Sequence, residues 1–236
     1  MQLKVMSFNT QHCRNFLTGI IDFDCMADTI SRFSPDIVGL NEMRMEGEHP
    51  EYTDQVPELA RLAGYPYWYF AKALDVSGKN PYGNGILSKY PIQYAETIPV
   101  PDPVEKDEGQ HYETRCLLHV KIDIMGGLDV FVIHFGLNPS EQKNAVETVV
   151  ANLTDSRCIL MGDFNVTPDD PVLIPIQQEL FDTAALFPEL LFSYPSDKPC
   201  VKIDYIFVSQ DLVVHSANIP GVVSSDHRPH IAEIEL

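Results

Sequence analysis

The sequence predicts a layered α/β sandwich, in which β-sheets and helices pack on one another around a common core. Strand-like and helix-like segments alternate along its 236 residues, of which 44% are hydrophobic. That apolar content is enough for one substantial core in a single domain spanning residues 1–236. Two neighbouring strand-like segments form a predicted hairpin, which argues against a purely parallel, doubly wound sheet.

The individual elements are predicted from hydrophobic periodicity and turn residues. Strands are predicted at residues 3–8, 36–40, 67–71, 116–124, 129–134, 157–161, 203–208, 212–215 and 230–236. Helices are predicted at residues 23–33, 55–63 and 172–180. The aromatic run from Tyr65 to Phe70 is interpreted as a core strand, with a membrane-contacting loop as the alternative.

The hairpin prediction rests on residues 116–134. Apolar and polar residues alternate from residue 116 to residue 124, which predicts a half-buried strand. Gly126 and Gly127 then supply a turn into an apolar run. The two runs are therefore expected to pair in antiparallel fashion, with His134 at the end of the second.

A further helix is predicted directly after this hairpin. Asn138 can cap its first turn, Pro139 suits the first helical position, and Glu141 completes a capping box. The following residues place an apolar stripe on one face, formed by Val146, Val149, Val150 and Leu153.

The composition restricts partners and compartment. Asp and Glu number 34 against 16 Lys and Arg, for a net charge of -18, which disfavours non-specific binding of nucleic acid. The five cysteines form no CxxC pair, which favours a reducing compartment. The N-terminal segment lacks the apolar centre of a signal peptide, and no apolar stretch approaches the roughly 20 residues that span a bilayer. A cytoplasmic protein without a membrane span is expected.

Polar side chains stand where several predicted strands end. These residues are Asn9, Glu42, His134, Asp163 and Asn165. Asp204 follows inside an otherwise apolar strand, and Asp226 and His227 come after it near the C-terminus. Strand ends of an α/β sandwich converge, so these groups are expected to meet. Carboxylates, amides and imidazoles without a cysteine cluster suit Mg²⁺ or Mn²⁺ better than Zn²⁺. Such an ion polarises phosphoryl oxygens, and a histidine paired with an aspartate supplies acid–base chemistry, so phosphate-ester hydrolysis is the predicted reaction.

Five short motifs carry a family resemblance. They are Ser7-Phe8-Asn9, Leu40-Asn41-Glu42, Gly162-Asp163-Phe164-Asn165, Ile203-Asp204-Tyr205-Ile206-Phe207 and Ser225-Asp226-His227. In this order they resemble the endonuclease/exonuclease/phosphatase superfamily of metal-dependent phosphoesterases. The resemblance implies a two-layered β-sandwich flanked by helices, the four-layer α/β/β/α fold of deoxyribonuclease I. It also implies that residues 1–236 form one catalytic domain.

The resemblance further implies a metal centre and an acid–base pair. Glu42 is the expected main ligand of Mg²⁺ or Mn²⁺, with Asn9 and Asp226 completing or supporting the site. His227 is expected to act as general base or as proton-transfer partner at the phosphate. Asp204 is expected to hold its orientation and tautomer.

The remaining groups are expected to act on water and on the phosphate. Asp163 would position or deprotonate the attacking water. Asn165 and His134 would donate hydrogen bonds to the phosphoryl oxygens. Arg115 would either neutralise a non-bridging oxygen or form a structural salt bridge.

The substrate is expected to be a small soluble phosphodiester or phosphomonoester. A DNA or RNA nuclease of the same superfamily is the alternative, although the net charge does not favour it. A catalytically inactive phosphate-binding module is a further, less favoured alternative. The loops expected to recognise substrate are residues 46–53, 74–82, 99–111 and 193–199.

Overall fold

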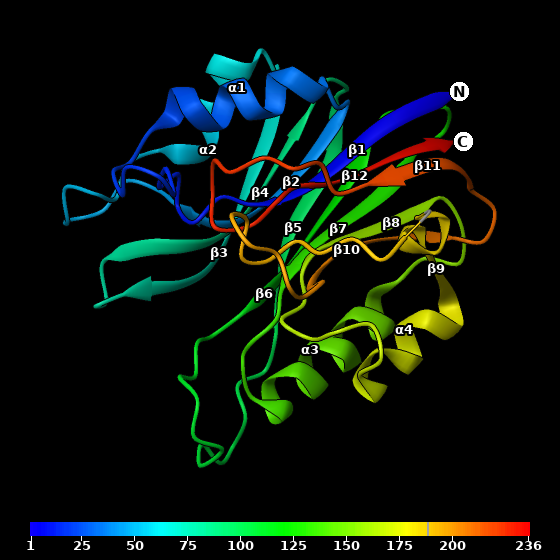
Figure 1. The fold of residues 1–236 in the computed structure, drawn as a ribbon. Coiled ribbons are helices and arrows are strands. Elements are labelled where there is room, and N and C mark those ends of the chain that lie inside the picture. The colour runs from blue at the N-terminus through cyan, green and yellow to red at the C-terminus, as the bar shows by residue number, and fades with distance from the viewer. Residues whose placement is uncertain (188) are drawn as a thin grey trace.

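In the computed structural model, which describes residues 1–187 and 189–236, two β-sheets pack face to face and helices cover both outer surfaces (Figure 1). Helices α1 (Phe23–Phe33) and α2 (Gln55–Ala63) cover one sheet, and α3 (Pro139–Asn152) and α4 (Ile174–Glu179) cover the other. Two short 3₁₀ helices, η1 (Pro171–Leu173) and η2 (Thr183–Leu186), flank α4. The predicted α/β/β/α layering is confirmed.

Each sheet has six strands. The first contains β1 (Gln2–Asn9), β2 (Ile37–Arg44), β3 (Tyr67–Val76), β4 (Asn80–Ser88), β11 (Val213–Asn218) and β12 (His230–Glu235), in the order β11-β12-β1-β2-β4-β3. The second contains β5 (Ile92–Pro99), β6 (Cys116–Ile122), β7 (Leu128–His134), β8 (Cys158–Asp163), β9 (Leu180–Asp182) and β10 (Asp204–Ser209), in the order β5-β6-β7-β8-β10-β9.

One parallel pair lies at the centre of each sheet. Strand β1 runs parallel to β2 and β7 runs parallel to β8, while the other pairs are antiparallel. Parallel neighbours end at the same edge, so Asn9 lies beside Asn41, and His134 beside Asp163. Strand β10 is antiparallel to β8, and its first residue, Asp204, pairs with Asp163. We call this common edge of the two sheets the polar edge.

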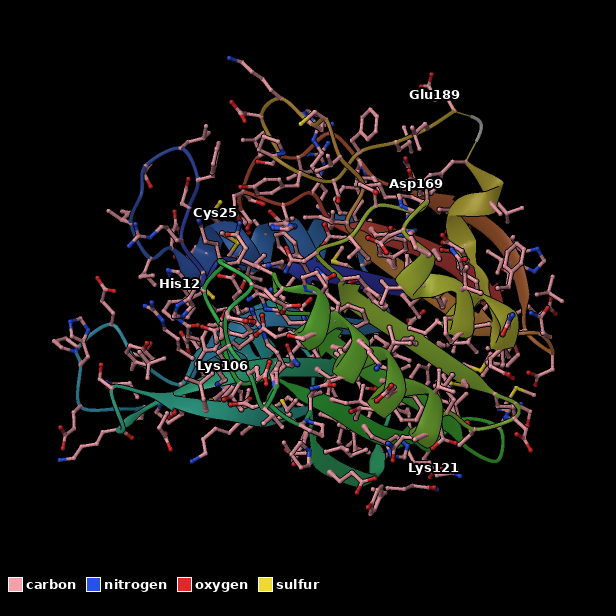
Figure 2. The ribbon with its side chains drawn as sticks, turned by 90° about the horizontal axis from the view of Figure 1, so that it is seen from below. His12, Cys25, Lys106, Lys121, Asp169 and Glu189 are labelled. Atoms are coloured by element: carbon pink, nitrogen blue, oxygen red, sulfur yellow. The ribbon has the colours of Figure 1, made fainter. Side chains whose placement is uncertain are left out.

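The apolar side chains form three clusters that correspond to the layer contacts. The largest fills the space between the sheets, and the other two lie beneath the helices. Figure 2 labels His12 at the polar edge and Lys121 near the opposite end of the sheets. None of the helices in residues 1–187 and 189–236 is long and apolar enough to span a bilayer.

The predicted hairpin is confirmed, because β6 and β7 pair in antiparallel fashion. In β6 the residues predicted to face the core are buried and His119 and Lys121 on the other face are partly exposed, as expected of a half-buried strand, whereas Leu117 is buried. Leu118, Val120 and Ile122 face the core between the sheets. Leu117 packs on the opposite face with Ala145 of α3. A sheet covered on both sides buries positions that alternation alone assigns to solvent.

Several elements differ from the prediction. Strands β4, β5 and β9 were not expected, and the helix predicted at residues 172–180 divides into η1, α4 and the start of β9. The aromatic run does enter a strand, β3, but this strand lies at the edge of its sheet. Tyr67 and Trp68 are therefore 38% and 42% exposed. The prediction that they lie in the core was wrong.

Gly162 lies where β8 approaches β7 too closely for a side chain. An added Cβ would lie 1.8 Å from the carbonyl oxygen of Ile133, and the backbone φ is +149°. We expect Gly162→Ala to lower the free energy of unfolding by about 3 kcal/mol, because the backbone must shift. Gly221→Ala, which meets no atom within 4 Å, is the matched control. Urea denaturation measures both, and equal stabilities would contradict this packing.

Candidate active site

Glu42 occupies an irregular part of β2 at the polar edge. The pairing of β2 with β4 shifts register between Leu40 and Met43, and Glu42 adopts a left-handed φ of 62°. A bulge of this kind redirects a side chain out of the regular alternation, at a cost in backbone strain. The Glu42 carboxylate contacts Asn9 Nδ2 at 3.1 Å and His12 Nδ1 at 3.6 Å. Burial opposes its ionisation, but His12 and Asn9 help lower the pKa to about 2.

Asn9 connects the two sheets. Its Nδ2 donates to Glu42 Oε1 in the first sheet and to Asp163 Oδ2, 3.0 Å away, in the second. Its Oδ1 accepts a hydrogen bond from the backbone N–H of Gln11. The amide of Asn9 therefore holds the two carboxylates at a fixed separation.

Asp163 lies at the centre of the site and is only 1% exposed. In addition to Asn9, its Oδ2 faces His134 Nε2 at 3.5 Å and His227 Nε2 at 3.6 Å. Its Oδ1 accepts from the backbone N–H of Asn165 at 3.0 Å. Burial raises the pKa of Asp163 above its usual range, although His227 opposes this shift. Asp163 is thus placed to accept a proton near neutral pH.

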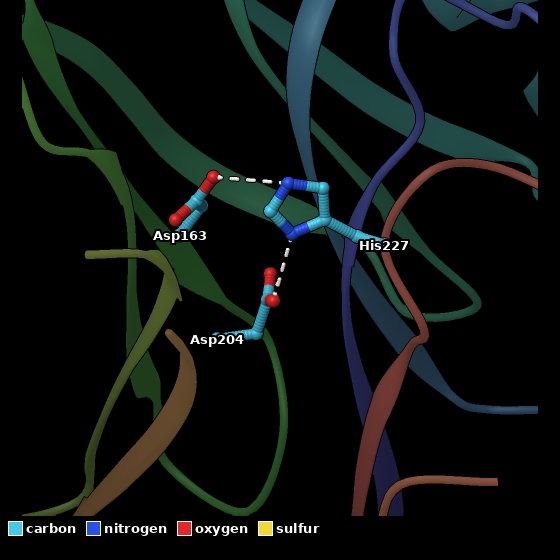
Figure 3. Close-up of side chains that lie close together, drawn as sticks. All are labelled: Asp163, Asp204 and His227. Carbon is cyan, nitrogen blue, oxygen red and sulfur yellow. Dashed lines mark hydrogen bonds and ion pairs between the residues drawn. The ribbon is translucent and has the colours of Figure 1, made fainter. Parts of the chain in front are cut away.

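His227 lies between two aspartates (Figure 3). Its Nδ1 lies 2.8 Å from Asp204 Oδ2, and its Nε2 faces Asp163. Burial alone would lower the pKa of His227, but the two carboxylates outweigh it and raise the pKa to about 10. These three residues bring potential ligand atoms within 4.8 Å of one another and can hold a metal ion. Both ring nitrogens of His227 already face carboxylates. A protonated imidazole between Asp204 and Asp163 therefore accounts for this geometry as well as a metal ion would.

His134 has a different environment. Its Nδ1 lies 3.0 Å from Arg115 Nη1, and both side chains are buried. The same Nη1 lies 2.6 Å from Glu113 Oε2. Burial and the charge of Arg115 hold the pKa of His134 well below its usual range. The sequence did not single out Glu113, and Arg115 forms the salt bridge that was one of its two expected roles.

Asn165 and Asp226 complete the set of predicted residues. Asn165 adopts a left-handed φ of 52°, and its Nδ2 donates to the carbonyl of Phe135, which leaves a second N–H for another acceptor. Asp226 Oδ1 accepts from Ser225 Oγ at 3.1 Å. Burial raises the pKa of Asp226, and the charge of Glu42 adds to this effect. The structure therefore brings all the predicted site residues to the polar edge.

Two further groups were not predicted from the sequence. Asn41 spans the sheets: its Nδ2 donates to the carbonyl of Ile133, and its Oδ1 accepts from the backbone of Asp163. The ring of Tyr194 lies 4.8 Å from that of His227, between ring centroids, and the residue is 37% exposed. The sequence placed Asn41 in a family motif but gave it no role. It placed Tyr194 in the predicted recognition loop 193–199 but did not single it out.

Comparisons with known proteins show the family of the chain. A sequence model of the Endonuclease/Exonuclease/phosphatase family matches residues 6–227. The uncharacterized protein YbhP of Escherichia coli (strain K12) is 28% identical over 235 residues, covering 89% of this chain and 87% of YbhP.

Solved structures share the fold. An endonuclease/exonuclease/phosphatase from Beutenbergia cavernae DSM 12333 superposes with a TM-score of 0.81 at 23% identity, covering 100% of this chain and 72% of that one. The mannosyl-6-phosphatase Bt3783 of Bacteroides thetaiotaomicron VPI-5482 has a TM-score of 0.77 at 16% identity, covering 99% of this chain and 100% of that one. The family model spans the motifs that meet at the polar edge. The chain belongs to the endonuclease/exonuclease/phosphatase family.

Proposed function

We propose that the protein is a divalent-metal-dependent hydrolase that cleaves a small soluble phosphate ester by in-line attack of water. Members of its family are generally phosphoester hydrolases that depend on divalent metals. The observation that carries the proposal is the convergence of His134 and His227 on one oxygen of Asp163, which Asn9 joins to Glu42. This arrangement places a proton acceptor, hydrogen-bond donors and an ionised carboxylate around one point.

The carboxylates fit a cation such as Mg²⁺ or Mn²⁺. Glu42 stays ionised, and its charge adds to burial in disfavouring ionisation of Asp226, although His227 opposes this shift. Glu42 and Asp226 would supply hard oxygen ligands, and Asn9 would orient Glu42. When bound, the ion would neutralise charge on the phosphoryl oxygens.

The chain's own groups divide the remaining tasks. Asp163, with its raised pKa, orients the attacking water and takes its proton. His134 and the free N–H of Asn165 donate to phosphoryl oxygens as negative charge develops on them. His227, held by Asp204, provides the charged donor and the transferable proton at the phosphate.

The distribution of charge favours a small substrate over a nucleic acid. Most lysines and arginines already have a carboxylate within 4.0 Å, namely Lys4, Arg44, Arg61, Lys72, Lys79, Lys89, Lys106, Arg115, Lys121, Lys143 and Lys202. A polynucleotide needs a row of free cations along its backbone. The half-exposed ring of Tyr194 beside His227 instead offers a flat apolar surface to an organic leaving group.

A substrate panel tests the reaction and its substrate together. We expect release of phosphate or alcohol from small phosphomonoesters or diesters with Mg²⁺, none with EDTA, and weaker nicking of plasmid DNA. Asp163→Asn should lower kcat by about 10³-fold or more without unfolding the protein, whereas the exposed Asp169→Asn should not. Activity that survives in Asp163→Asn would refute the assigned chemistry, and preferred plasmid cleavage would refute the small substrate.

Glu42→Gln tests the metal ligand. The amide keeps the shape of the side chain but removes its charge, so the Mg²⁺ concentration for half-maximal rate should rise at least about tenfold. Glu179→Gln, at an exposed position at the end of α4, should leave it unchanged. Titrations of rate against Mg²⁺ measure the difference, and an unchanged midpoint in Glu42→Gln would exclude this residue as the main ligand.

Asp204→Asn tests the charge of His227 through pH. The Asp204 carboxylate raises the pKa of His227, so its imidazolium persists until the pH rises through about 10. Without that carboxylate the pKa falls, and the alkaline limb of the kcat profile should move down by roughly 1–3 units. The acid limb should also move down, because the charge of Asp204 contributes to the raised pKa of Asp163. An alkaline limb that does not move would show that His227 does not act as imidazolium.

A further inference from the structure

The two histidines that face Asp163 have opposite partners at Nδ1. His227 Nδ1 meets the carboxylate of Asp204 at 2.8 Å, whereas His134 Nδ1 meets the guanidinium of Arg115 at 3.0 Å. Their Nε2 atoms lie 3.6 and 3.5 Å from the same oxygen, Asp163 Oδ2. Both rings thus direct Nε2 toward Asp163, but the partner of Nδ1 is an anion for His227 and a cation for His134.

The chemistry of the partner determines which ring nitrogen carries hydrogen. A carboxylate only accepts hydrogen bonds when ionised, so Nδ1 of His227 must donate to Asp204. A guanidinium only donates and does not lose its proton in proteins. Nδ1 of His134 must therefore accept from Arg115, and the ring hydrogen of His134 must be on Nε2, facing the site.

Arg115 is firmly held in this position. The side chain is 8% exposed, and Nη1 lies 2.6 Å from Glu113 Oε2 as well as 3.0 Å from His134 Nδ1. A guanidinium Nη carries two hydrogens, one for each of these acceptors. Glu113 balances the buried charge, so Arg115 can remain beside a neutral ring.

We propose that Arg115 is a positioning residue that holds His134 in the neutral Nε2–H tautomer, so that His134 serves as a fixed donor to a phosphoryl oxygen and not as an acid. This inference rests on the proposed function for its catalytic meaning. It leaves His227 as the imidazolium of the pair. The lowered pKa of His134, caused by burial and by Arg115, agrees with a neutral ring.

The neutral state of His134 beside the imidazolium of His227 matters for catalysis. A second imidazolium beside Asp163 would compete with His227 for the carboxylate and would neutralise the group that takes the proton from water. Arg115 avoids this by occupying the lone pair of Nδ1, the nitrogen at which His134 would otherwise be protonated. The hydrogen-bond donor is thus present in every turnover without a change in its charge.

The direct test is nitrogen NMR of the full chain with labelled histidine, which needs no turnover. Two-bond ¹H–¹⁵N correlation spectra distinguish the two neutral tautomers and the imidazolium. The His134 signals are assigned by their loss in His134→Gln. In the wild-type protein we expect the pattern with hydrogen on Nε2 and none on Nδ1. A wild-type ring with hydrogen on Nδ1 would overturn the proposal, whether or not a substrate has been found.

Variants at Arg115 test the cause. Arg115→Met removes the donor and should change the His134 spectrum toward a tautomer mixture or an imidazolium, while Arg115→Lys should restore the wild-type pattern. Arg157→Met removes a partly buried arginine that bonds the carbonyls of Ile124 and Gly127, and it should leave His134 unchanged. A wild-type His134 spectrum in folded Arg115→Met would overturn the proposal.

Kinetics separate positioning from direct contact with the phosphate. If Arg115 acts through His134, Arg115→Met should lower kcat about 10- to 100-fold with little change in KM or in inhibition by inorganic phosphate. Arg115→Lys should recover most of the loss. Weakened phosphate inhibition with unchanged kcat would instead identify Arg115 as a direct phosphate ligand and would contradict the proposal.

Discussion

The amide of Asn41 joins the two sheets, and the geometry of the site depends on this junction. Its Nδ2 donates to the carbonyl of Ile133 and to Asn84 Oδ1, and its Oδ1 accepts from the backbone N–H of Asp163. Asn41 is fully buried, so a lost partner would cost about 1–3 kcal/mol. Apolar contacts between sheets tolerate sliding, whereas a buried amide with three partners does not. The ends of β2, β7 and β8 are therefore held together within the tolerance of a hydrogen bond.

This junction brings three carboxylates close together, and the neighbouring side chains offset part of their negative charge. Asp163, Asp204 and Glu42 come from different strands and would repel one another if left alone. His227 offsets two of them by lying between Asp163 and Asp204. Glu42 is left facing His12 and Asn9, with its charge only partly compensated. A cation would therefore be attracted most strongly to Glu42, the carboxylate that lies outside the pairing of His227 with Asp163 and Asp204.

The sequence allowed the layers and the meeting of the candidate site residues to be predicted, because both depend on strand periodicity and on where strands end. It failed where neighbours in space override local pattern. Strand β4 contains Gly83, at which a Cβ would lie 2.0 Å from the carbonyl oxygen of Ala71, so a residue typical of turns is required inside a sheet. Trp68 was assigned to the core because nothing local shows that β3 is an edge strand. The partners of Arg115 could not be predicted, since they depend on side-chain directions in the segment before β6 and at the end of β7.

The loop proposed to contact the substrate is held in place by the elements that carry the proposed catalytic groups. Tyr194 lies in a loop, yet hydrogen bonds hold that loop to β10 and to the segment that carries Asp226. Ser193 Oγ accepts from the backbone of Asp204, and the backbone N–H of Ser196 donates to the carbonyl of Asp226. The aromatic surface is therefore fixed relative to His227 as firmly as if it were part of the sheet. Substitution at Tyr194 can change the shape offered to the leaving group while these backbone bonds remain. Under the proposed function, the loop side chains would therefore determine which ester is accepted, while the strand-end groups stay in place.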